Sequence, residues 1–258
     1  MSNINKFFLI TIIITASFSS VYAQGTAGDK AKYETRFIVD MPTAGMLPNN
    51  YYSVTGYVYP MGGIMIAADF GIWNFVNAGL SFSGNNIVGD ADVTWQNLPG
   101  INIKARALDE KVYLPALTFG FNSQGSSNYM GDNRFKTHSP GFFMALSKNF
   151  LWDLGNLAFH TGLNYSLEPK PEYSSPNVYF GAEQSIGDYF AVNGEFNLQL
   201  DEQENGFYSK RGLFNLSLRG SIANGITAEI KLRDLFNHAR YSEGPERIIA
   251  LEVIKVLK

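Results

Sequence analysis

The chain has 258 residues, of which 45% are hydrophobic, 14% aromatic and 17% charged, with 25 glycines and no cysteine. This length allows one all-β domain or two smaller domains, and the lack of cysteine excludes both disulfides and a lipid-acylated cysteine. A net charge of -3 provides no basic field, so we expect no nucleic-acid partner.

The first 23 residues have the features of an export signal. Lys6 supplies a positive start, residues 7–14 (FFLITIII) form an apolar stretch, and Val21-Tyr22-Ala23 resembles a cleavage site before Gln24. The apolar stretch is too short for a transmembrane anchor. We therefore predict a signal peptide over 1–23; the alternative is a buried N-terminal helix of the mature fold.

Residues 24–50 differ from the rest of the chain. The strand-like stretch YETRFIVD leads into DMPTAGMLPNN (residues 40–50), which contains two prolines and a glycine. We expect this N-terminal segment to lie at the periplasmic mouth of a barrel or in its lumen, with the barrel itself formed by residues 51–258.

From residue 51 onward, stretches of about ten residues alternate between apolar and polar side chains. In residues 157–167, LAFHTGLNYSL, the leucines and aromatics alternate with smaller or polar residues. Ten residues suit a tilted strand that crosses hydrocarbon, whereas strands of soluble proteins average five or six. Strands are expected at 51–59, 64–73, 78–83, 101–108, 117–124, 142–150, 157–167, 178–186, 190–200 and 248–257, with one more pair flanking an Asn224-Gly225 turn within 215–236. The pattern predicts an all-β fold, a transmembrane antiparallel up-and-down β-barrel of about 12 strands.

The two faces of these strands differ in charge. One face is aliphatic and aromatic, and the other carries cations and anions in equal number, which we expect to pair across strands in a nearly neutral, narrow lumen. This lumen charge network comprises Asp69, Lys104, Arg106, Glu183, Glu195, Arg219, Glu229, Lys231, Arg233 and Glu252. A soluble barrel with the apolar face inside is the alternative, because alternation does not say which face points outward.

The connections between the expected strands alternate in length. Short links (74–76, 109–113, 151–156, 187–189 and 223–225) alternate with longer ones (84–100, 125–141, 168–177, 201–212 and 237–247). Short turns on one rim and long loops on the other are typical of barrels in the outer membrane of Gram-negative-type bacteria, where lipid surrounds the wall. Aromatic residues near strand ends, among them Tyr57, Tyr59, Trp73, Phe75 and Tyr113, suggest interfacial girdles.

Catalytic and metal-binding patterns are weak. His138, His160 and His238 lack metal-ligand spacing, and acidic residues in the long links suit solvated charge better than a calcium site. His160 could serve as a base for Ser166 or Ser217, although a hydrogen-bonding role in the lumen is the simpler interpretation. We expect no catalytic residue, no metal and no cofactor.

Three stretches resemble the YjbH-type family of outer-membrane β-barrel proteins linked to exopolysaccharide production. They are LPALTFGFNSQG (residues 114–125), GFFMALSKNF (residues 141–150) and, most specifically, the N-terminal motif Asp40, Met41, Pro42, Thr43, Ala44, Gly45, Met46, Leu47 and Pro48. The resemblance implies a role in exopolysaccharide export, with polysaccharide or its export machinery as partner. We therefore expect a non-enzymatic narrow channel or binding barrel; the alternatives are a lipid-modifying enzyme and a structural or adhesive barrel that acts through its outer loops.

Overall fold

The structure is a computed structural model that describes residues 27–29, 32–131, 134–168, 175–201, 207–240 and 244–257. The predicted signal peptide, residues 1–23, lies outside these ranges. In the described part of the chain, no helix has the length and apolar character needed to cross a membrane.

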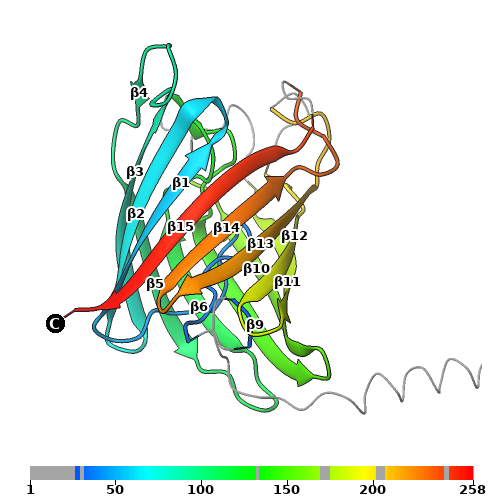
Figure 1. Cartoon of the computed structure of the whole chain (residues 1–258). Coiled ribbons are helices and arrows are strands. Elements are labelled where there is room, and N and C mark those ends of the chain that lie inside the picture. Colours follow the sequence, from blue (N-terminus) through cyan, green and yellow to red (C-terminus); the bar gives the residue numbers. More distant parts are fainter. Residues whose placement is uncertain are drawn as a thin grey trace, which may run out of the picture.

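Twelve long antiparallel strands form one closed barrel, which confirms the predicted fold class (Figure 1). Each strand pairs with the next long strand in the chain, and β1 pairs with β15, from Tyr51 opposite Val256 to Val58 opposite Ile249. The strands are β1 (Tyr51–Tyr59), β2 (Gly63–Ile72), β3 (Val76–Asn85), β5 (Gly100–Leu108), β6 (Ala116–Asn122), β9 (Gly141–Trp152), β10 (Gly155–Tyr165), β11 (Asn177–Ile186), β12 (Phe190–Asn197), β13 (Leu213–Ala223), β14 (Ile226–Arg233) and β15 (Glu246–Val256).

The two rims of the barrel differ as the link lengths predict. One rim, the short-turn rim, carries the connections 73–75, 109–115, 153–154, 187–189 and 224–225. The other, the long-loop rim, carries the short elements η1 (Pro60–Gly62), β4 (Thr94–Trp95), β7 (Tyr129–Gly131) and β8 (Arg134–Phe135). The predicted Asn224-Gly225 turn lies between β13 and β14, and Gly225 has φ +76°, where a Cβ would also meet the Ile254 carbonyl oxygen at 2.3 Å.

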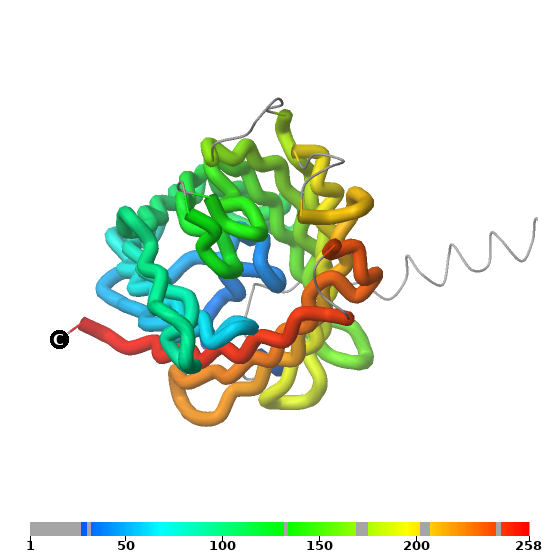
Figure 2. The backbone as a smooth tube through the Cα atoms, turned by 90° about the horizontal axis from the view of Figure 1, so that it is seen from above, coloured from blue at the N-terminus to red at the C-terminus, as the bar shows by residue number. Residues whose placement is uncertain are grey.

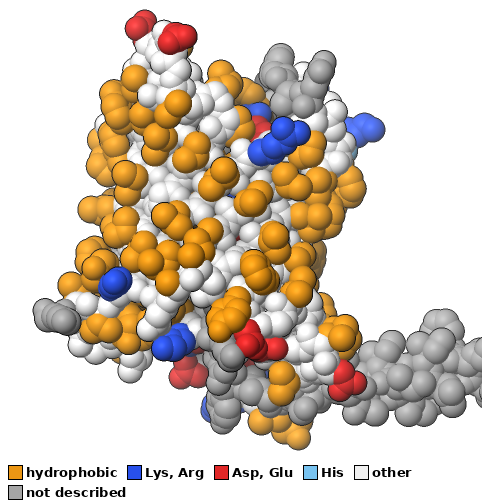
Figure 3. Space-filling model, in the orientation of Figure 1, with side chains coloured by type: hydrophobic (Ala, Val, Ile, Leu, Met, Phe, Trp, Pro, Cys, Tyr) orange, Lys and Arg blue, Asp and Glu red, His pale blue; other side chains and the backbone are white. Residues whose placement is uncertain are grey.

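The apolar face of the strands points outward. Phe159, Leu218 and Ile230 are 48%, 45% and 54% exposed, and hydrophobic side chains cover much of the visible outer surface (Figure 3). Glu195, Lys231 and Arg233 on the opposite face are only 1%, 3% and 2% exposed. The alternative of a soluble barrel with an apolar interior is therefore wrong, because its interior would have to hold leucine and phenylalanine rather than these charges.

The aromatic side chains only partly follow the expected girdles. Trp73 and Phe75 are exposed at the short-turn rim and stack with ring centroids 5.7 Å apart. Tyr59, by contrast, is buried with Met65 and Ile248, and the ring of Tyr57 lies 5.1 Å from Lys231 Nζ. The prediction that Tyr57 and Tyr59 belong to a girdle was wrong, because both side chains take the inward parity of β1.

Residues 32–50, which we call the lumenal segment, are not part of the wall, and residues 35–47 of this segment lie inside the barrel (Figure 2). Ile38, Val39, Thr43 and Ala44 are all fully buried. A tight reversal holds the middle of the segment, in which Ile38 N donates to Met41 O at 2.8 Å and Thr43 N donates to Arg36 O at 3.0 Å. Asp29, earlier in the predicted N-terminal segment, instead binds Gly187 and Ser185 at the short-turn rim, so the described parts of that segment lie both at the mouth and in the lumen.

Candidate functional site: the filled lumen

A single carboxylate anchors the middle of the lumenal segment. Oε2 of Glu195, on β12, accepts hydrogen bonds from three consecutive backbone N–H groups: Val39 at 3.0 Å, Asp40 at 2.8 Å and Met41 at 2.8 Å. Its Oε1 accepts from Asn215 Nδ2 at 2.9 Å. Because each of these donors would otherwise be buried without a partner, Glu195 fixes both the position and the direction of the segment.

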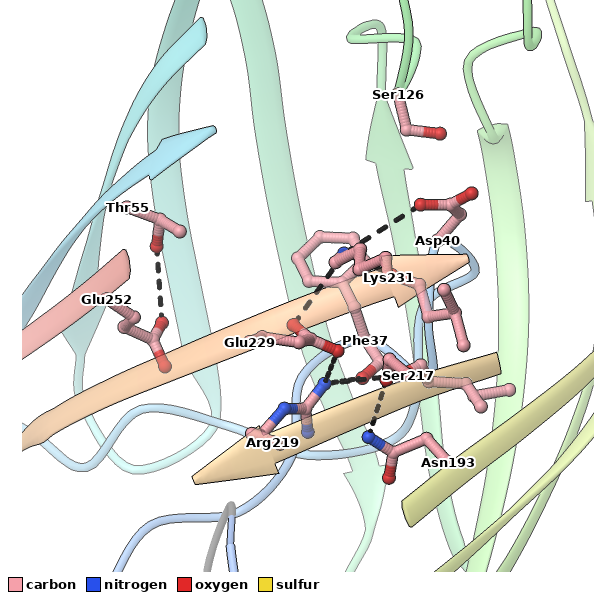
Figure 4. Close-up of polar contacts among 12 residues, drawn as sticks. Phe37, Asp40, Thr55, Ser126, Asn193, Ser217, Arg219, Glu229, Lys231 and Glu252 are labelled. Carbon is pink, nitrogen blue, oxygen red and sulfur yellow. Dashed lines mark hydrogen bonds and ion pairs between the residues drawn. The ribbon is translucent and has the colours of Figure 1, made fainter. Parts of the chain in front are cut away.

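Cationic and hydroxyl side chains of the wall bind the carbonyl groups of the same segment. Arg219 Nη2 donates to Phe37 O and Ile38 O, both at 3.1 Å, as Figure 4 shows for Phe37. Further carbonyl groups are bound by Lys231 (Val39 O), Tyr179 (Pro42 O, 2.8 Å), Lys104 (Thr43 O, 3.3 Å) and Arg106 (Ala44 O, 2.7 Å). The wall therefore contacts the main chain of the segment on both its donor and its acceptor groups.

Two charged side chains of the segment form ion pairs with the wall. Arg36 contacts Glu252 and lies 3.4 Å from Asp69. Asp40 contacts Arg233 and lies 3.8 Å from Lys231 (Figure 4 shows Lys231 with Asp40). Since both members of each pair are largely shielded from water, loss of one member would leave the other charge poorly compensated.

A third ion pair lies nearer the short-turn rim. Glu34 of the segment contacts the guanidinium of Arg106, which also lies 3.6 Å from the exposed Asp109. Oε2 of Glu34, which contacts Arg106, also accepts from Met46 N at 2.8 Å, so this carboxylate joins two parts of the segment to the wall.

All ten residues of the predicted charge network face the lumen, and nine of them contact the lumenal segment. Arg219 pairs across strands with Glu183 at 3.2 Å and with Glu229 at 3.0 Å, and Lys231 approaches Glu229 at 3.8 Å. Besides Arg219 and Lys231, the members that contact the lumenal segment are Asp69, Lys104, Arg106, Glu183, Glu195, Arg233 and Glu252. Sequence reasoning missed Glu34 and Arg36 as members of the network, although their charges in a short segment beside the motif were visible in the sequence.

Glycine residues allow the segment and the wall to approach closely. A Cβ on Gly71 of β2 would lie 2.0 Å from the Pro48 carbonyl oxygen, whereas one on Gly45 would lie 2.0 Å from the carbonyl oxygen of Thr35 in the segment itself. These contacts are with backbone atoms that cannot rotate away, so Gly71 lets the segment lie close to the wall and Gly45 lets the segment fold back on itself.

The space left around the segment is small. A pocket of about 380 Å³ lies between the segment and strands β5 to β11, where Ala116 and Ala158 present small side chains, and Asp109 and Glu110 of the connection 109–115 place it toward the short-turn rim. On the side toward β1 and β2, a gap of about 70 Å³ remains. The pocket therefore borders the segment at two places, Glu34 to Thr35 and Ala44 to Gly45.

The long-loop rim is folded inward over the segment. Thr137 Oγ1 lies 3.2 Å from Tyr208 OH, and Arg233 donates to the Ser126 carbonyl. Glu168 accepts from Phe135 N at 3.0 Å; burial raises its pKa, against the opposing effect of His138 and of the N–H donors. These contacts join three of the long links to one another or to the wall.

His160 has a different partner from the two serines proposed for it. Its Nδ1 lies 2.8 Å from Ser147 Oγ, which also accepts from Ala44 N at 2.9 Å. Ser166 instead lies 3.4 Å from Ser139, and Ser217 accepts from Asn193 at 2.9 Å. The structure thus corrects the suggested pairs, and it places His160 in a chain of contacts that ends on the lumenal segment. Within the described residues, no group of three or more His, Asp or Glu side chains could hold a metal ion.

Comparison with known proteins adds little to this description. No protein-family model matches the chain, and no curated protein matches it. Among solved structures, a NanC porin in a rhombohedral crystal form is 12% identical, with a TM-score of 0.45 over 80% of this chain and 100% of the porin. The assignment of the barrel rests on the strand pairing described above.

Proposed function

We propose that the protein is a non-enzymatic outer-membrane channel that its own lumenal segment closes at rest. The membrane location is supported by the outward apolar face, by strands of 7 to 12 residues and by the difference between the two rims. A lipid environment suits the exposed leucine, isoleucine and phenylalanine side chains of the wall, which in water would form an apolar surface far larger than soluble monomers carry.

One observation carries the proposal of a closed channel: Glu195 and the wall cations bind the main chain of the segment inside the bore. Barrels of about eight strands are filled by side chains alone, whereas barrels of sixteen or more enclose an open channel. A barrel of twelve strands is wide enough to pass solute only after the segment has moved. Polysaccharide is the solute that we propose, on the resemblance of residues 40–50 to YjbH-type proteins, since the stretch that carries it is the part of the chain that fills the lumen.

The test of this function is ion conductance in planar bilayers. The full-length protein should give small or rare openings, and a variant that lacks residues 32–48 should give large, stable ones. Heat-resistant migration on gels and β-rich circular dichroism would verify that both barrels are folded. Large openings of the full-length protein, or a folded deletion variant that stays closed, would contradict the proposal.

The rims give a second prediction, about orientation. With the long loops outside the cell, a cysteine at Asp90 should react with a membrane-impermeant thiol reagent on intact cells, and one at Asn224 should react only after lysis. Both positions are exposed, and the natural chain has no cysteine to interfere. Labelling of Asn224→Cys alone on intact cells would show that the barrel has the opposite orientation. Equal labelling of both variants on intact cells would exclude the membrane location.

A further inference from the structure

We propose that the lumen wall is a receptor for a polypeptide main chain folded back in a tight reversal, and that a second polypeptide of suitable charge pattern, entering from the short-turn rim, takes the place of residues 36–47. This inference rests on the proposed function in one respect, namely that the lumenal segment can leave the bore.

The bonds that hold the segment go largely to groups that every polypeptide has. The wall accepts N–H groups through Glu195 (three donors), Ser147 (Ala44 N, 2.9 Å) and Asn77 (Leu47 N, 2.8 Å). It donates to carbonyl groups through Arg219, Lys231, Tyr179, Lys104, Arg106 and Asn77. Because these bonds do not involve the side chains of the bound segment, a chain of different sequence can satisfy them.

Side-chain contacts add a short charge pattern. Arg36 is bound by Glu252 and Asp69, and Asp40, four residues later, is bound by Arg233 and Lys231. Nine residues after Arg36, a Cβ on Gly45 would meet the Thr35 carbonyl oxygen of the segment itself at 2.0 Å, so this glycine lets the segment fold back on itself. The partner that fits the wall is therefore a segment with a basic residue and an acidic residue four positions later, and a glycine five positions after that lets it fold back in the same way.

Exchange of one polypeptide for another is easier than emptying the lumen. With the segment absent, Glu195, Arg219 and Lys231 would lose the main-chain groups that compensate them, whereas an incoming main chain restores those bonds. The pocket of about 380 Å³ beside Glu34, Ala44 and Gly45 gives an incoming chain space at the rim where Asn49 and Asn50 are exposed.

The experiment measures peptide binding to the barrel in detergent. A protease site inserted between Asn49 and Asn50 is cleaved after folding, the released segment is washed out under mild denaturant, and fluorescent peptides are added to barrels that keep their heat-resistant gel mobility. The probes are a peptide of residues 32–50, a shuffled peptide that keeps only Arg36, Asp40 and Gly45 in place, a peptide N-methylated at Val39 and Met41, and a peptide carrying Arg36→Glu with Asp40→Arg.

The native and shuffled peptides should bind with affinities within about tenfold of each other, and the N-methylated and charge-exchanged peptides should bind at least about 100-fold more weakly. Failure of the shuffled peptide, with the native one bound, would overturn the inference in favour of a segment recognised by its own side chains. Equal binding of the N-methylated peptide, or no binding of any peptide to the folded barrel, would also overturn it. Conductance of the same washed barrel reports separately on the proposed function, because an empty barrel that conducts but binds no peptide rejects this inference alone.

Discussion

Replacement of Ile230 by arginine should lower the free energy of unfolding by roughly 2–4 kcal/mol, the cost of placing a charge near the midplane of a bilayer on the outer face of a barrel. Ile230 lies at mid-height on β14, between Leu218 of β13 and Ile249 of β15, and its side chain points outward. Urea unfolding of the protein refolded into lipid vesicles measures the effect.

Ile186→Arg is the matched control for this prediction. Ile186 is 53% exposed on the outer face, but it pairs with Phe190 at the short-turn rim, where the same substitution should cost about 0–1 kcal/mol. Equal tolerance of arginine at both positions would show that no hydrocarbon surrounds the wall, and the membrane assignment would fail.

Replacement of Glu195 by alanine should raise the frequency of channel openings at least about tenfold. Three backbone N–H donors of the segment lose their acceptor, and each buried donor left unpaired costs roughly 1–3 kcal/mol, of which water entering the bore recovers a part. Even about 1.4 kcal/mol of this loss would change the equilibrium between closed and open states tenfold. Single-channel recording in planar bilayers counts the openings.

Glu110→Ala controls for the removal of a carboxylate from the same barrel. Glu110 contacts Lys148 Nζ at 3.0 Å and Asn149, both of the wall. Its replacement by alanine should therefore leave the opening frequency close to that of the unmodified protein. If Glu195→Ala and Glu110→Ala behaved alike, the bonds between Glu195 and the segment would not control opening.

The barrel was predictable from the sequence because its signals are local. Alternation along each strand reports which side chains share a face, and link lengths report which rim a connection occupies. The turn at Gly225 follows from two adjacent residues. The prediction that Tyr59 belongs to an aromatic girdle was wrong because it used only the position of this residue near a strand end. The alternation of side chains along β1 places Tyr59 inside the barrel.

The filling of the lumen was not predictable in detail, because its contacts join distant parts of the chain. Arg36 contacts Glu252, 216 residues away, and the bonds from Glu195 go to backbone groups that every residue carries. Prediction of the partner of His160 requires the register of β10 against β9, because Ser147 lies directly opposite His160 on β9. Once the expected strands are aligned as hairpins, that pairing can be read from the sequence, whereas the path of residues 32–50 cannot.

The most direct measurement of the central claim is the conductance of a barrel whose segment can be locked in place. Ala44 and Ser147 are in contact, with Ala44 N 2.9 Å from Ser147 Oγ, and the chain has no other cysteine with which an engineered pair could react. In a Glu195→Ala background, the double variant Ala44→Cys with Ser147→Cys should conduct when reduced, fall silent when the disulfide forms and conduct again after reduction, with mass spectrometry reporting the bond. Current that persists in the fully oxidised protein would contradict the account, because the channel would then open with its segment still in the lumen.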